Sequence, residues 1–91
     1  MQKSELFTIA QAATKIAMHG ASEYLRVKQL KADDHALSEC IGSWVKLTFP
    51  EAMRDAKDAI DCGMTQASIA TFNASMINAG IQAAKECAMP A

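Results

Sequence analysis

The stretch Cys62–Ala84, CGMTQASIATFNASMINAGIQAA, contains no Asp, Glu, Lys or Arg, although 21% of the 91 residues in the chain are charged. On a helix of 3.6 residues per turn, its apolar and polar side chains separate onto two faces. The apolar face is rich in small residues, and the polar face carries hydroxyls and amides, which lose water at a lower cost than charges do. We therefore predict a central helix over about 65–88 that is covered on most sides. Its apolar face comprises Ile69, Phe72, Met76, Ile77, Gly80, Ala83, Ala84 and Cys87, and its polar face Ser68, Thr71, Ser75, Asn78, Gln82 and Glu86.

The composition predicts one small all-α domain over residues 1–91. Hydrophobic residues make up 51% of the chain but aromatic residues only 5%, so the core must form by close approach of helix backbones. A net charge of −1 gives no electrostatic reason to expect nucleic acid or an anionic membrane as partner. The N-terminal residues do not resemble a secretory signal, and the uncharged stretch is too polar for a membrane span. We therefore expect a cytoplasmic protein that does not bind membranes.

The rest of the chain predicts three further helices, and hence a small four-helix, bundle-like domain. Ser4 is the expected cap of a helix over about 4–31, whose apolar stripe crosses Gly20 without a change of phase. Asp33 and Asp34 cap a second helix over 34–48. The sequence Thr48-Phe-Pro-Glu51 matches a capping box and predicts a new helix over 49–62, with Gly63 as its stop. The inward positions of this third helix are Phe49, Ala52, Met53, Ala56, Ala59 and Ile60.

Gly20 and Gly80 occupy corresponding places in the first and last of these helices, sixty residues apart. A glycine lets two helix axes approach below the usual separation of about 8–10 Å. One hypothesis is that the two glycines mark a close crossing of long helices. Chance similarity is the alternative.

Few residues suggest a catalytic or metal site. Cys40, Cys62 and Cys87 are odd in number and have no CxxC spacing, so we expect three unpaired thiols in a reducing compartment. His19 and His35 lack a second ligand three or four residues away, which favours surface histidines. No nucleophile, phosphate-loop or dinucleotide motif occurs. We expect no enzyme activity, no cofactor and no metal. Glu51, Asp55 and Asp58 form an acidic ridge that we interpret as a solvated face.

These features favour a non-enzymatic protein–protein interaction or regulatory module, of the kind that phages and mobile elements also encode to modulate host proteins. We predict a homodimer that buries the uncharged polar strip of the last helix, because a helix face in water normally carries Lys and Glu. One alternative is a protein that binds a small ligand or nucleotide on the same strip, and a weaker one is nucleic-acid binding through a basic patch in residues 24–31. We also predict that Trp44 packs with Leu37, Ile41 and Leu47. The strip consists of Thr71, Ser75, Asn78 and Gln82, and the patch of Arg26, Lys28 and Lys31.

Overall fold

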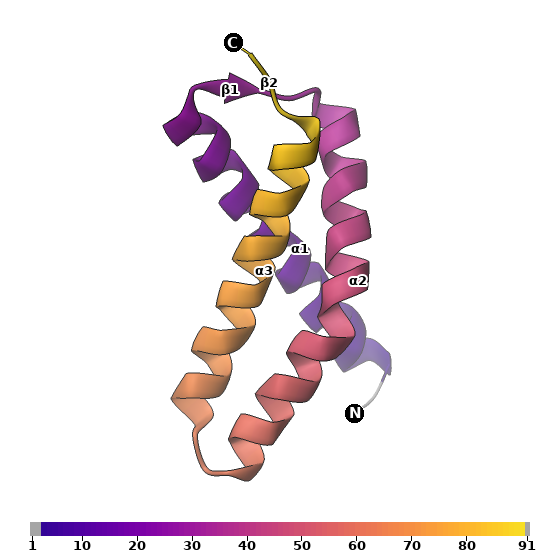
Figure 1. Ribbon diagram of the computed structural model, residues 1–91. Coiled ribbons are helices and arrows are strands. Elements are labelled where there is room, and N and C mark those ends of the chain that lie inside the picture. The colour runs from indigo at the N-terminus through magenta and orange to yellow at the C-terminus, as the bar shows by residue number, and fades with distance from the viewer. Residues whose placement is uncertain (1–2, 91) are drawn as a thin grey trace.

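The computed structural model describes residues 3–90, which form three long helices and one very short pair of strands (Figure 1). The helices are α1 (Lys3–Lys28), α2 (Asp34–Asp61) and α3 (Thr65–Cys87). The strands β1 (Leu30–Lys31) and β2 (Met89–Pro90) pair antiparallel, with Leu30 opposite Pro90. The predicted all-α class is confirmed. Three helices rather than four occur in the described part of the chain.

The difference arises at Pro50, where we predicted a boundary between helices over 34–48 and 49–62. The structure instead has one helix of 28 residues with Pro50 inside it. The Thr48 hydroxyl does not cap a new helix, because it donates to the carbonyl of Trp44 at 2.7 Å, one turn back. Both a proline and a threonine bonded in this way bend a helix. The ribbon of α2 accordingly changes direction near its middle (Figure 1).

The remaining boundaries largely follow the sequence signals. Asp33 caps α2 by accepting from the backbone N–H of Ala36 at 3.0 Å, as predicted. Gly63, with φ of 78°, ends α2 in a left-handed conformation, as predicted. Ser4 is not a cap, since it lies within α1. The first helix is continuous through Gly20 but ends three residues earlier than expected, where Gln29 adopts a positive φ of 56°.

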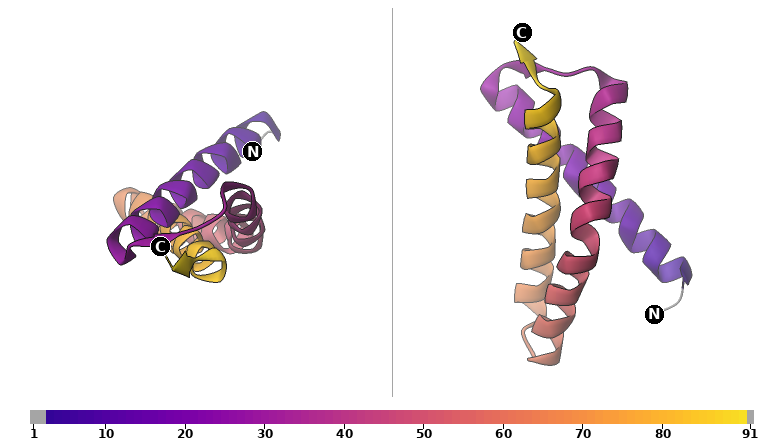
Figure 2. Two further views of the ribbon diagram at one scale, coloured as in Figure 1. Left: turned by 90° about the horizontal axis from the view of Figure 1, so that it is seen from above. Right: turned by 45° about the vertical axis from the view of Figure 1, so that its right-hand side comes forward.

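Helices α2 and α3 form an antiparallel hairpin, and α1 lies obliquely across it (Figure 2). The core at the crossing is built from alanines and glycines rather than large side chains, which lets the three backbones approach closely. Trp44 is half-buried against this core with Leu37 and Ile41, as predicted, but Leu47 is 71% exposed and does not join them. The buried core residues are Ala13, Ala17, Ala21, Ile41, Val45, Ala52, Met76, Ala83 and Ala84.

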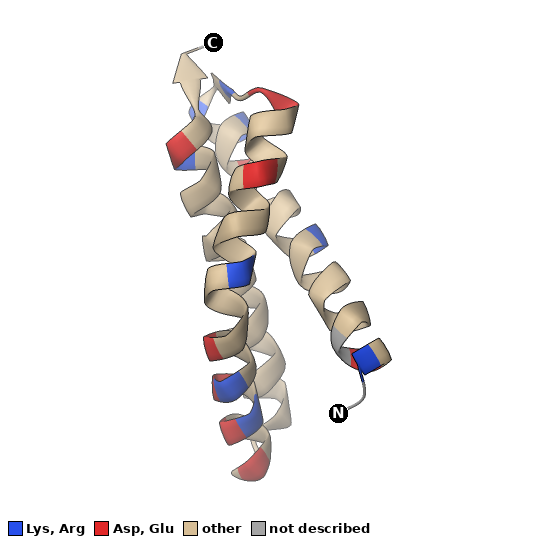
Figure 3. Ribbon diagram, turned by 90° about the vertical axis from the view of Figure 1, so that its right-hand side faces the viewer, with Lys and Arg blue, Asp and Glu red and all other residues tan. Residues whose placement is uncertain are grey.

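Gly20 and Gly80 lie where α1 and α3 cross, which confirms the hypothesis drawn from their spacing. A Cβ atom at Gly20 would lie 2.7 Å from the carbonyl oxygen of Ile77, and one at Gly80 would lie 2.6 Å from the carbonyl carbon of Ala17. Any larger side chain would therefore push the helices apart. Beyond this crossing, towards the N-terminus, α1 diverges from the hairpin (Figure 3).

Candidate interaction cleft

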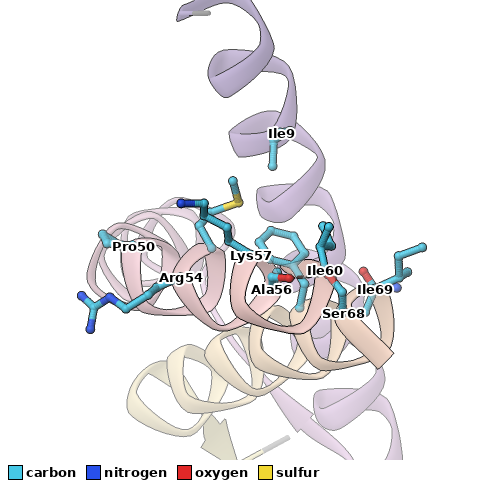
Figure 4. Close-up of a pocket in the computed structure, with 11 residues that line it drawn as sticks. Ile9, Pro50, Arg54, Ala56, Lys57, Ile60, Ser68 and Ile69 are labelled. Carbon is cyan, nitrogen blue, oxygen red and sulfur yellow. Dashed lines mark hydrogen bonds between the residues drawn. The ribbon is translucent and has the colours of Figure 1, made fainter. Parts of the chain in front are cut away.

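An apolar cleft of about 590 Å³ lies between the N-terminal part of α1 and the closed end of the hairpin. All three helices contribute to it, and Ile9 of α1 points towards the hairpin side chains (Figure 4). We call it the apolar cleft. Its lining residues are Ile9, Pro50, Met53, Arg54, Ala56, Lys57, Ile60, Ser68, Ile69, Phe72 and Asn73.

Two local features hold the hairpin wall of the cleft in place. The buried Ser68 hydroxyl donates to the carbonyl of Ala56 at 2.9 Å, which joins α3 to α2 near the turn at Gly63. The rings of Phe49 and Phe72 meet edge to face, with centroids 6.0 Å apart. Such a contact contributes about 0.5–1.5 kcal/mol beyond simple burial. The wall is therefore a packed surface that exists before anything binds to it.

The rim of the cleft exposes large apolar side chains to water. Ile60 is 53% exposed and Ile69 58% exposed, whereas the sequence pattern placed both on inward faces. Phe7, two residues before Ile9 on α1 and outside the cleft lining, is 65% exposed. Clustered exposed apolar residues of this kind mark interaction surfaces more often than isolated ones do.

The lining offers little for proton transfer or metal binding. Its titratable side chains are Arg54 and Lys57, and Arg54 extends away from the apolar wall (Figure 4). The Ser68 hydroxyl already has a partner in Ala56. The floor is aliphatic and aromatic, and a few polar groups lie at its edge.

The uncharged polar strip predicted as a dimer surface does not form a single open face. Ser75 and Asn78 line a polar pocket of about 210 Å³ between α3 and α2, together with Thr48, Glu51 and Asp55. Asn78 and Thr71 are exposed, while Ser75 and Gln82 are half-buried. Glu51 and Asp55 of the acidic ridge thus face the uncharged polar strip of the same chain.

The basic residues of segment 24–31 are spread over two elements. Arg26 and Lys28 lie in the last turn of α1, and Lys31 lies on β1. The Arg26 guanidinium pairs with Glu23 at 2.8 Å, and this pair lowers the pKa of Glu23 and raises that of Arg26. One of the three positive charges of the patch is therefore balanced within the helix.

His19 and His35 are exposed, as predicted, and the imidazole Nε2 of His35 lies 3.0 Å from a carboxylate oxygen of Glu39. Among residues 3–90, no three His, Cys, Asp or Glu side chains are grouped closely enough to hold a metal ion. Within the same residues, no helix has the length and apolarity needed to cross a membrane.

Comparison of the chain with protein-family models, with curated proteins and with solved structures gave no match.

Proposed function

We propose that this chain is a non-enzymatic interaction module that works as a homodimer, with a second copy of the chain in the apolar cleft. The observation that carries the proposal is the cleft itself, which is open, apolar and lined in part by the exposed Ile60 and Ile69. Regulation of another protein by this dimer, as phage-encoded modulators do, is the class of role we propose for it.

The exposed surface area of the chain supports the existence of a binding partner. A compact monomer of 9.8 kDa exposes about 5,200 Å², whereas this chain exposes 6,176 Å². The excess, about 1,000 Å², is close to the roughly 800 Å² that each subunit buries in a standard-size interface. The excess is spread over a thin body of 45 × 24 × 15 Å, whose long faces are open to a second copy. One copy can therefore bury enough surface on another to form a stable dimer.

The shape of the chain supports a second copy as that partner. Residues 3–12 of α1, which we call the N-terminal arm, project from the hairpin and carry Phe7 (Figure 3). The cleft wall on α2 runs from Pro50 to Ile60. Both stretches are about 15 Å long at 1.5 Å per residue. A two-fold axis would place each arm against the other chain's cleft, so the same contact would form twice in the dimer.

The exchanged arm would also supply the fourth helix that the isolated chain lacks. Beside the arm of its own chain, each hairpin would receive the arm of the partner, and Ile60 and Ile69 would be covered. Burying such a side chain contributes about 1.5–3 kcal/mol relative to leaving it in water.

Binding of a small ligand or nucleotide on the uncharged polar strip remains the second proposal. Its support is the polar pocket that contains Ser75 and Asn78. The volume of about 210 Å³ lies below the roughly 300–1,000 Å³ of usual ligand sites. A thermal-shift screen with metabolites and nucleotides tests it, and a reproducible shift that Asn78→Ala abolishes would favour it over the dimer.

Light scattering in the tens of micromolar tests the dimer. We expect twice the mass of 9.8 kDa for the unmodified chain and a monomer for Phe7→Asp, with unchanged helical circular dichroism because Phe7 is mostly exposed. Val27→Asp is the matched control, since Val27 is also 65% exposed but lies near the other end of the same helix, outside the N-terminal arm. It should remain dimeric.

A monomeric unmodified chain, or a dimer that persists in Phe7→Asp, would overturn the arm exchange. The double variant Ser75→Arg with Asn78→Arg separates the two candidate surfaces. If this variant dissociates the dimer while keeping its helical content, and Phe7→Asp does not, the interface lies on the polar strip.

A further inference from the structure

Cys40 and Cys87 bring two thiols together at the open end of the hairpin. Cys40 lies in the second turn of α2 and Cys87 is the last residue of α3. Their sulfur atoms are 2.6 Å apart, and the Cys87 sulfur also lies 3.6 Å from the carbonyl oxygen of Ala36. This sulfur–sulfur separation is much nearer to the roughly 2.05 Å of a covalent S–S bond than to the 3.5–4.0 Å or so at which unbonded carbon atoms rest. The two helices thus hold the two thiols in direct contact, where a bond between them can form.

The third cysteine shows that this pairing is specific. Cys62 is exposed, and it lies beside Gly63 at the turn that closes the other end of the hairpin. No third His, Cys, Asp or Glu joins Cys40 and Cys87 to make a metal site among the described residues. Two adjacent thiols without further ligands can react with each other to form a disulfide.

We propose that Cys40 and Cys87 are a redox-active pair that closes into an intramolecular disulfide by exchange with a small disulfide such as glutathione disulfide. One thiolate attacks a sulfur of the oxidant, forms a mixed disulfide and releases one glutathione thiolate. The second thiolate then attacks the protein sulfur of that mixed disulfide and releases the other. The two cysteines lose two protons and two electrons, and the glutathione disulfide is reduced to two thiols.

The contact between the two thiols affects the protonation of Cys87. The hydrogen bond that the Cys87 thiol donates to Cys40, together with burial, raises the pKa of Cys87 to about 11. Cys87 therefore keeps its proton at neutral pH. Because the thiolate is the nucleophile in exchange, Cys87 must lose this proton before its sulfur can attack.

Closure would tie α2 to α3 at the end where the chain has no turn between them. The bond would span 47 residues of sequence, and it would lie next to the pair of β1 and β2. A cross-link over so long a loop removes much of the freedom of the unfolded chain, so the melting temperature should rise on the order of 10 °C. The hairpin would then be most stable under oxidising conditions.

The test equilibrates the reduced protein with excess glutathione disulfide, alkylates the remaining thiols and measures the mass. We expect a Cys40–Cys87 bond in the non-reducing peptide map, with the exposed Cys62 outside it as an alkylated thiol or a mixed disulfide with glutathione. The melting temperature should fall again when reductant is added. Cys62→Ser should behave in the same way. Cys87→Ser should lose the rise in melting temperature and retain glutathione on Cys40.

Three alkylated thiols after equilibration, or glutathione bound to all three cysteines of the unmodified chain, would overturn the proposal. A bond that forms only between chains through Cys62 would overturn it as well. The unmodified protein alone decides the proposal, so the decision does not depend on whether a variant folds.

Discussion

The Cα of Gly80 rests directly on the main chain of Ala17, and a Cβ added there would lie 2.6 Å from the Ala17 carbonyl carbon. The reciprocal contact joins Gly20 to Ile77. Helices α1 and α3 therefore touch backbone to backbone, and the flanking positions Ala13, Ala21 and Ala83 are fully buried. Helices α1 and α3 can cross this closely only because the side chains at the crossing are small.

Gly80→Ala should therefore destabilise the protein, although alanine favours helices over glycine by up to about 1 kcal/mol. The added methyl group meets backbone atoms that cannot rotate away, and overpacking of this kind costs about 1–3 kcal/mol or more. Gly42→Ala is the matched control, because a Cβ at Gly42 has no neighbour within 4 Å inside the same kind of helix. It should gain about 0.5–1 kcal/mol. Urea unfolding followed by circular dichroism measures both, and equal effects would refute the close crossing.

Ser68→Ala should lower the free energy of unfolding by about 0.5–1.5 kcal/mol, because it removes the buried hydrogen bond to the Ala56 carbonyl. Ser22→Ala provides the comparison, since Ser22 is an exposed residue within α1. That change should be neutral or slightly stabilising. Chemical denaturation of the two variants gives the difference, and a Ser68→Ala protein as stable as Ser22→Ala would show that the hydroxyl contributes nothing.

The rate at which Cys87 is alkylated in the reduced protein should keep rising to a pH that is unusually high for a thiol. Its raised pKa of about 11 means that the reactive thiolate is scarce at pH 8 and increases about tenfold per pH unit. The stability that the thiol hydrogen bond contributes is complete below the ordinary value of 9.0 and is lost as the pH rises through about 11. Iodoacetamide rates resolved by peptide mapping test this, with Cys40→Ala expected to make Cys87 react faster at pH 8. A rate that levels off by pH 9 would contradict it.

The extents of the helices could be predicted largely from the spacing of apolar residues. The one large error arose because a local capping motif was given more weight than that spacing. Ile41, Val45, Ala52 and Ala56 are all buried and keep one helical face across Pro50. The same reasoning correctly carried α1 through Gly20. At Thr48-Phe-Pro-Glu51 the capping-box pattern was preferred, yet the apolar face there continues without interruption and packing of that face outweighs the lost backbone hydrogen bond.

The candidate site was harder to predict, because it depends on where α1 leaves the hairpin. Ile60 and Ile69 are apolar residues on apolar faces, and their exposure follows only from the angle of the crossing at Gly20 and Gly80. The contact of Cys40 with Cys87 is equally invisible in the sequence, since 47 residues separate them. Both features arise from the relative placement of helices, which periodicity does not report.

The crossing also sets an order of events during synthesis. Helix α1 is made first, but the surface on which it docks lies around Gly80, about sixty residues later in the chain. At roughly 5–20 residues per second, a ribosome takes several seconds to supply that surface. Helices α2 and α3, joined by a short turn, can pair as soon as both exist. Until then the alanine stripe of α1 lacks the α3 part of its docking surface, and this interval is when a chaperone, or the arm of a neighbouring nascent chain, would find it.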